Sequence, residues 1–297
     1  MKKYFLLAVH ATLVAQVPAF HSKVAIFDIA TRQSRIVYEQ DGIVEAPNWS
    51  RDGKFLLINK DGGLFRLTLD GKTDRIPLSA DYRCNNDHDL SPDGKRIAFS
   101  ASTPDVRQSR VFVANADGTD VRLLTPDAPS YFHGWSPDGK WLAFVGRRDG
   151  KFELFRVSAD GGKEERLTAE GGYDDGPEYS PDGRHIWFNS TRTGLMQVWR
   201  METDGSNPTQ MVHEDANCWF PHVSPDGKQV VYIVYKKDEV APGDHPANKN
   251  VEIRLVSAAG GESRTVAKLF GGQGTMNVNS WSPDSRTIAF VSYRLKT

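Results

Sequence analysis

Short runs of apolar and β-branched residues alternate with turn residues along almost the whole chain. The tetrapeptide Ser-Pro-Asp-Gly, or a close variant of it, recurs six times, and each copy is followed by such a run. Proline presets the first corner of a type I turn, Asp caps the turn through its side chain, and Gly takes the left-handed position. Each copy therefore predicts a tight β-hairpin. The six turns begin at Ser50, Ser91, Ser136, Ser180, Ser224 and Ser282.

A second hairpin pattern follows five of these turns. Segments such as Glu153–Gly161 and Gln197–Gly205 alternate apolar and polar residues and end at Asp-Gly, as in a hairpin with a tight turn. The turn serines are 41 to 45 residues apart, except for a final step of 58 residues. Periods of about 40–50 residues are typical of propeller blades, in which four strands form one sheet.

The sixth copy of the second hairpin is found at the other end of the chain, in residues 23–37. We therefore expect the last blade to combine two strands from each terminus, which leaves no open sheet edge in the ring. The sequence predicts an all-β fold. It is a single six-bladed β-propeller of four-stranded antiparallel blades over residues 23–297, with the last blade closed by both termini.

Composition narrows the class of protein. Of the 297 residues, 39% are hydrophobic and 25% are charged, which indicates a globular chain. Lys and Arg number 37 against 38 Asp and Glu, so no basic excess indicates nucleic-acid binding. We expect a monomer with no membrane span. Cys84 and Cys218 belong to opposite blades, beyond disulfide reach, and are expected to be free thiols.

Residues 1–22 have the outline of a secretory signal peptide. Met1-Lys2-Lys3 is basic, a short apolar run follows, and Val17-Pro18-Ala19 supplies a small residue at a cleavage site. His10 and Gln16 interrupt the apolar run. The N-terminus predicts export to the periplasm or the medium, and the alternative is a frayed extension on a cytoplasmic protein.

Departures from the internal repeat identify a candidate site. Three positions before the turn serine, blades 1, 4 and 5 carry proline, whereas blades 2, 3 and 6 carry His88, His133 and Asn279. These positions enter the innermost strand and are expected to face the mouth of the central channel. Convergent polar groups in a concave site are typical of ligand binding. The predicted ligand-binding residues are Asn86, Asp87, His88, His133, Asp174, Asp175, Arg192, Trp219, His222, Gln273 and Asn277.

His88, His133 and His222 are the candidate metal ligands, with one divalent ion (Mn, Zn or Ca) as the possible cofactor. Imidazole and carboxylate groups suit such ions. The alternative is that each histidine fills a loop by hydrogen bonding to its backbone, as short polar side chains often do. No His-x-His or His-x-x-x-His spacing prearranges a pair.

The 58-residue step contains about fourteen residues more than a regular blade needs. They fall between Lys236 and Asn250 and include His245. Long loops on a rigid scaffold often carry function. We expect this loop to fold over the channel mouth and to bring His245 to the site as a fourth imidazole. Rim loops are expected to add Arg147, Arg148, Arg192, Lys236 and Lys237.

The repeats resemble those of the TolB-type six-bladed propellers, in which an aromatic residue precedes Ser-Pro-Asp-Gly-Lys and Ile-Ala-Phe follows. The resemblance covers residues 23–294 and implies the propeller fold. This fold hosts binders, scaffolds and enzymes. The interpretation that we favour is an exported, non-catalytic protein whose channel mouth binds a small glycan, a peptide or a partner protein.

A second resemblance, to oligogalacturonate lyases, gives the alternative of a metal-assisted carbohydrate-active enzyme. Those propellers hold a metal through histidines at the channel mouth. The resemblance implies catalytic candidates at Asp175, Arg192 and His133. Asp175 would be a base or a residue beside the metal, and Arg192 would clamp a substrate carboxylate through its planar fork of donors.

Overall fold

Each Ser-Pro-Asp-Gly copy forms the tight turn that the sequence predicts. In the turn at Ser136, the amide of Gly139 donates to the carbonyl of Ser136 at 2.8 Å. The Ser136 hydroxyl donates to Asp138 at 2.5 Å and accepts from the amide of Trp141 at 2.9 Å. Gly139 has a φ of 69°, which explains why glycine follows the aspartate. The serine-to-aspartate bond recurs in all six turns.

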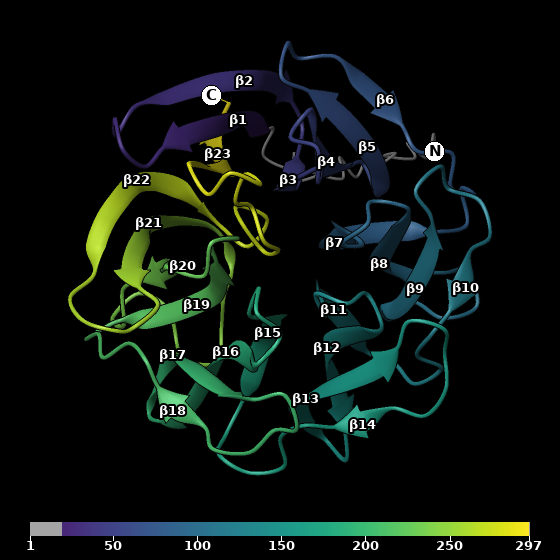
Figure 1. Ribbon diagram of the computed structural model, residues 1–297. Helices are drawn as coiled ribbons and strands as arrows, with labels where there is room; N and C mark the ends of the chain where they lie inside the picture. Colours follow the sequence, from purple (N-terminus) through teal and green to yellow (C-terminus); the bar gives the residue numbers. More distant parts are fainter. Residues whose placement is uncertain (1–19, 297) are drawn as a thin grey trace, which may run out of the picture.

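The computed structural model describes residues 20–296, which form six antiparallel sheets around a central channel (Figure 1). Five sheets have four strands in chain order from the channel outward. Blade 1 contains β3 (Val44–Trp49), β4 (Phe55–Lys60), β5 (Gly63–Thr68) and β6 (Thr73–Arg75). Blade 2 contains β7 (Arg83–Leu90), β8 (Arg96–Ser102), β9 (Arg110–Asn115) and β10 (Arg122–Leu123).

The next three blades follow the same order. Blade 3 contains β11 (Ser130–Trp135), β12 (Trp141–Arg148), β13 (Lys151–Ser158) and β14 (Glu165–Arg166). Blade 4 contains β15 (Asp174–Tyr179), β16 (His185–Thr193), β17 (Leu195–Glu202) and β18 (Thr209–Gln210). Blade 5 contains β19 (Asn217–Val223), β20 (Gln229–Tyr235), β21 (Ala247–Ser257) and β22 (Arg264–Gly272).

Both ends of the chain build the sixth blade, as the sequence predicts. Strand β1 (Phe20–Asp28) lies between β2 (Ser34–Asp41) and β23 (Thr287–Leu295) and pairs with both (Figure 1). The innermost segment of this blade is reduced to a single bridge between Trp281 and Ile288. Strand β1 begins three residues before the expected start of the propeller, and the rest of the predicted leader lies outside the described residues.

The innermost strands are irregular at a shared position. In blades 1 to 5 the register of the innermost strand shifts just before the serine that begins the first turn of that blade. In blades 1, 4 and 5 the residue preceding the proline has a positive φ, namely Ala46 (49°), Gly176 (61°) and Phe220 (55°). Such bulges turn the following side chains to a different face of the strand.

The long step is only partly a loop. Residues 236–246 connect β20 to β21, but β21 extends to eleven residues and pairs along its length with β22. The predicted loop over residues 236–250 is therefore shorter in the structure and ends at residue 246. Residues 247–250 instead lengthen the hairpin of β21 and β22. After β22, a segment from Gln273 to Ser280 runs toward the channel (Figure 1), and Thr275, Met276 and Val278 are buried in it.

Neighbouring blades are joined by buried aromatic side chains. The indole of Trp135 in blade 3 donates to the carbonyl of Asp89 in blade 2 at 3.3 Å, and Trp281 donates to the carbonyl of His222 at 3.0 Å.

Cys84 and Cys218 are buried and unpaired, as predicted, and burial raises the pKa of Cys84 to about 12. No helix among residues 20–296 is long and apolar enough to cross a membrane.

Candidate functional site

A cavity of about 270 Å³ lies at the channel mouth where the inner strands of four blades meet the loop before β21. Blade 2 supplies an aspartate, blade 3 an imidazole, and blade 4 a second aspartate. The segment after β22 supplies two amides. The lining residues are Asp87, Tyr131, His133, Val145, Phe152, Tyr173, Asp175, Phe220, His245, Gln273 and Asn277.

The two carboxylates and the imidazole form a connected set. Nε2 of His133 lies 3.1 Å from Oδ1 of Asp175, which also accepts the amide of Gly176 at 2.7 Å. The hydroxyl of Tyr173 donates to Oδ2 of Asp175 at 2.7 Å, and Nε2 of His245 lies 3.8 Å from the same oxygen. Both oxygens of Asp175 are thus engaged by the protein.

Burial and these contacts shift the pKa values of the pair in opposite directions. Burial acts to lower the pKa of His133, but the hydrogen bond and the charge of Asp175, together with the charge of Asp87, raise it above its ordinary value. Burial acts to raise the pKa of Asp175, yet His133 and His245 hold it below its usual range. Both shifts therefore favour the charged forms of the pair, an imidazolium and a carboxylate.

Asp87 is in a different situation. Its Oδ2 accepts from the side-chain amide of Asn85 at 2.7 Å, while within residues 20–296 its Oδ1 accepts no hydrogen bond. Burial, opposed by the charge of His133, raises its pKa to about 6. Nearby, burial and the charge of Asp87 raise the pKa of Glu45 to about 7. Asp87 is thus a buried, mostly ionised acceptor with an unused oxygen.

Aromatic rings complete the walls of the cavity. The ring of Phe220 stacks on His133 with centroids 5.9 Å apart, and Phe152 lies 5.4 Å from Tyr173. The imidazole of His245 packs 4.3 Å from the indole of Trp219. Packing on Trp219 and Phe220 positions the loop over the channel mouth, so His245 reaches the cavity as predicted, but it lies there with His133 and not as a fourth imidazole.

The structure brings together five of the predicted ligand-binding residues and separates the others. The five that line the cavity, besides His245, are Asp87, His133, Asp175, Gln273 and Asn277. Those that do not line it are Asn86, His88, Asp174, Arg192, Trp219 and His222. Trp219 is fully buried behind His245, and the side chain of Asn86 reaches Glu45 at 3.4 Å instead.

Arg192 and Asp174 are partners of each other and take no part in the cavity. The guanidinium donates to both oxygens of Asp174 at 3.2 and 3.3 Å, and the two side chains are 13% and 1% exposed. Successive residues of a strand point to opposite faces, so Asp174 faces away from the channel when Asp175 faces into it. The predicted clamp is therefore a buried ion pair within blade 4.

The other rim cations are also engaged. Arg148 pairs with Glu164 at 2.9 Å, Lys236 with Glu239 at 2.7 Å, and Lys237 with Asp215 at 2.6 Å. Arg147 donates to a backbone carbonyl and lies 5.9 Å from the ring of Phe152. None of them lines the cavity.

The predicted histidine trio does not fit a metal ion. The two ring nitrogens of His222 lie 2.6 Å from Glu178 and 3.2 Å from the carbonyl of Met276. His88 is fully buried, and burial lowers its pKa to about 4. Only His133 reaches the cavity. In the described part of the chain, no three His, Cys, Asp or Glu side chains are arranged to hold a metal, and no metal-dependent step follows from this geometry.

Sequence reasoning missed Glu45 and the aromatic wall. Tyr131 and Tyr173 each lie two positions before a residue that was identified, His133 and Asp175. Alternation along a strand places such pairs on the same face, so this signal was present in the sequence. No comparable signal marked Phe220, because a bulge and a positive φ set its direction.

Comparisons with known proteins agree with this architecture. A family described as "PD40: TolB beta propeller domain" matches residues 126–268. A relative from Agrobacterium fabrum is 44% identical over 277 residues, 93% of each chain. The structure of a putative TolB from Agrobacterium tumefaciens has a TM-score of 0.89 at 44% identity, and the match covers 93% of this chain and 99% of that one.

More distant structures share the fold alone. TolB from Acinetobacter baumannii is 19% identical with a TM-score of 0.66, over 85% of this chain and 64% of that one. An oligogalacturonate lyase in complex with manganese is 17% identical with a TM-score of 0.52, over 76% of this chain and 66% of that one. The internal repeats, the six closed blades and the similarity over nearly the whole chain lead to one conclusion: this protein belongs to the TolB-like β-propeller family.

Proposed function

We propose that this propeller is a binding protein whose channel-mouth cavity takes a basic side chain of a peptide or partner protein. The observation that carries the proposal is Asp87, a residue only 4% exposed that lines the cavity and whose Oδ1 accepts no hydrogen bond from residues 20–296. A buried charge is costly unless it is paired. A lysine or arginine side chain entering the mouth would supply the missing donor and the opposite charge.

The remainder of the cavity suits the same ligand. Asp175 and His133 balance one another, so the charge of Asp87 is left over. The hydroxyl-bearing rings of Tyr131 and Tyr173, with Phe152 and Phe220, offer apolar and π surface for the methylene stem and the cation of such a side chain. A neutral glycan, the other ligand class that the sequence predicts, carries no positive charge to meet Asp87.

We further propose that the protein is exported to the periplasm or secreted. The support is the N-terminal pattern of a basic start, an apolar run and a small residue near position 19. Fractionation of cells that produce the full chain, with mass determination of the mature N-terminus, tests this proposal. A full-length product confined to the cytoplasm would overturn it.

A small set of blocked peptides tests the binding proposal. Acetyl-Ala-Xaa-Ala-amide peptides, in which Xaa is lysine, arginine, norleucine or glutamate, are titrated into the protein by NMR. We expect saturable shifts around the cavity with lysine or arginine only. Asp87→Asn should weaken this binding at least tenfold, because a charge-assisted contact is lost. Equal binding of the lysine and norleucine peptides, or equal binding by Asp87→Asn, would overturn the proposal.

A further inference from the structure

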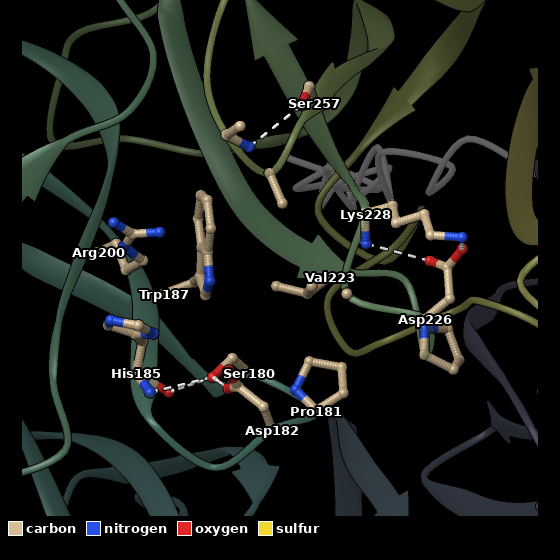
Figure 2. A pocket seen from close by; sticks show the side chains of 14 residues that line it. Ser180, Pro181, Asp182, His185, Trp187, Arg200, Val223, Asp226, Lys228 and Ser257 are labelled. Atoms are coloured by element: carbon tan, nitrogen blue, oxygen red, sulfur yellow. Dashed lines mark hydrogen bonds and ion pairs between the residues drawn. The ribbon is translucent and has the colours of Figure 1, made fainter.

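A second cavity lies on the opposite side of the molecule from the loop before β21, in the junction between blades 4 and 5. Its volume is about 780 Å³, which lies within the range of small-molecule sites. The turns at Ser180 and Ser224 and the turn after β21 form its walls, and Trp187 and Arg200 project from neighbouring strands of blade 4 (Figure 2). We call it the interblade groove.

Internal repetition shows what is unusual about Arg200. Arg66 in blade 1 and Arg156 in blade 3 occupy the same repeat position, five residues before the glycine of the second turn. Arg66 donates to the carbonyl of Ala116 at 2.6 Å, and Arg156 donates to the carbonyl of Thr203 at 3.0 Å. Each bond joins one blade to the next.

The same two arginines also face a carboxylate on the outermost strand of their own blade. Arg66 pairs across the strands with Asp74 and lies 3.8 Å from its carboxylate. Arg156 pairs with Glu165 and lies 2.7 Å from it. In these two blades the guanidinium therefore has both a carbonyl and a carboxylate partner.

Arg200 has neither partner. Its cross-strand neighbour is Thr209, a neutral residue, and the carbonyl that corresponds to Ala116 and Thr203 belongs to Ala258. Within residues 20–296 no hydrogen bond or ion pair joins the Arg200 side chain to Ala258 or to any acid. The guanidinium of Arg200 lies over the indole of Trp187, 5.7 Å from the ring centroid, as that of Arg156 lies over Trp141 at 4.5 Å.

Trp187 is a second departure from the repeat in this blade. It stands seven residues after the turn serine, where the other five blades have the smaller Leu57, Ala98, Ala143, Val231 and Ala289. Trp187 pairs directly with Arg200 across β16 and β17. The interblade groove opens beside the indole of Trp187 (Figure 2).

The other charges of the groove are already satisfied. Asp182 accepts from the hydroxyl of Ser180 and the amide of Arg184, and Asp226 accepts from the hydroxyl of Ser224 and the amide of Lys228. Nζ of Lys228 lies 3.5 Å from Asp226. His185, on the rim, lies 3.7 Å from Glu202. Arg200 is thus the charge left without a counterion in the groove.

We propose that the interblade groove is a binding site for a carboxylate carried on a small apolar group. The carboxylate would occupy the place that Asp74 and Glu165 fill in blades 1 and 3, with the guanidinium fork donating to both of its oxygens. The apolar carrier would lie against Pro181, Pro225 and Val223, which line the same space. This site is separate from the channel-mouth cavity and does not depend on the function proposed for it.

Benzoate and its neutral isostere benzamide are the probes. Each is titrated into the full chain while the indole N–H signal of Trp187, assigned with Trp187→Phe, is followed by NMR. We expect a saturable shift with benzoate and none with benzamide. Arg200→Gln should weaken benzoate binding at least tenfold without lowering the melting temperature, because the Arg200 side chain makes no hydrogen bond with residues 20–296.

Two further variants make the test specific. Arg156→Gln, the matched control, should leave benzoate binding unchanged while lowering the melting temperature, since that arginine has both partners. Thr209→Glu should supply the missing carboxylate from within the chain and suppress benzoate binding at least fivefold with Arg200 still present. The proposal is overturned if benzoate does not bind, if benzamide binds equally, or if Arg200→Gln or Thr209→Glu leaves benzoate binding unchanged.

Discussion

The imidazole of His133 and the carboxylate of Asp175 lie 3.1 Å apart and join the innermost strands of blades 3 and 4 beneath the channel mouth. Their side chains are 5% and 6% exposed, so solvent screens the pair weakly. Around it stand Asp87, Glu45 and His245, whose pKa values depend on the charge of this pair or on one another. The mouth is therefore a small network of coupled titrating groups.

Removing the carboxylate of the pair should change the protonation of its partner. In Asp175→Asn the hydrogen bond and the charge that raise the pKa of His133 are lost, so burial dominates and this pKa should fall below its ordinary value. Titration of the His133 ring by NMR measures the change. Because His133 can then lose its charge, the stability cost at neutral pH should stay below the about 3–5 kcal/mol of a buried pair whose remaining member keeps its charge.

The outcome for Asp175→Asn has a matched control in Asp215→Asn, which removes an exposed carboxylate paired with Lys237. That variant should lose at most about 1 kcal/mol, as surface pairs do. An unchanged pKa of His133 in Asp175→Asn would show that the 3.1 Å contact does not control its protonation.

Stability should fall as pH rises from about 6.5 to 8, since the lowered pKa values of His88 and His245 act in the opposite direction only below this range. The pKa values of Asp87 and Glu45 are raised to about 6 and about 7, so the folded chain holds protons that the unfolded chain has already released. His133, with a raised pKa, stabilises the fold at low pH and loses that contribution as pH rises through its folded pKa. The lowered pKa of Asp175 changes the stability only at more acidic pH, where this carboxyl becomes protonated.

Glu45→Gln should flatten this pH dependence. The expected reduction is on the order of 2–3 kcal/mol between pH 5 and 8, since one pKa unit corresponds to about 1.4 kcal/mol. Chemical unfolding at several pH values measures it, with the exposed Glu262→Gln as the control. A pH profile of Glu45→Gln that parallels the parent would contradict the raised pKa of Glu45.

Arg192 should matter for stability and not for ligand binding. Arg192→Ala leaves Asp174, which is 1% exposed, without its partner, so we expect a loss of about 3–5 kcal/mol. Binding of the lysine peptide should remain unchanged at a temperature where the variant is folded. The double variant with Asp174→Asn should recover part of the loss. If the variant melts like the parent but no longer binds the peptide, Arg192 is a ligand-binding residue and this prediction is wrong.

Ring closure predicts a cooperative loss of structure on truncation. A chain that begins after Asp41 lacks β1 and β2, and the edge of β23 that pairs with β1 is then exposed. We expect the single unfolding transition of the whole propeller to disappear, as judged by circular dichroism and calorimetry. Removal of residues 1–19 alone is the control and retains both strands. A sharp transition near the parent melting temperature in the shorter chain would argue against closure by both termini.

The repeats made the fold predictable, because turn chemistry and alternation recur six times and errors at one copy are corrected by the others. Site residues were harder to predict. Asp174 and Asp175 are adjacent in sequence, but only one can face the channel. His88 and His133 share a repeat position, yet only His133 reaches the cavity. Local bulges in the innermost strands decide these directions, and nothing in the spacing of polar residues reveals them.

Peptide binding at the channel mouth can be followed directly at the carboxyl group of Asp87. The pKa of the Asp87 carboxyl is measured by carbon-13 NMR, first in the free protein and then with saturating acetyl-Ala-Lys-Ala-amide. A cation that pairs with Oδ1 favours the ionised carboxylate, so we predict that the pKa of Asp87 falls from about 6 by at least one unit. The norleucine peptide should leave it unchanged. A pKa of Asp87 that stays near 6 with the lysine peptide bound would contradict the account.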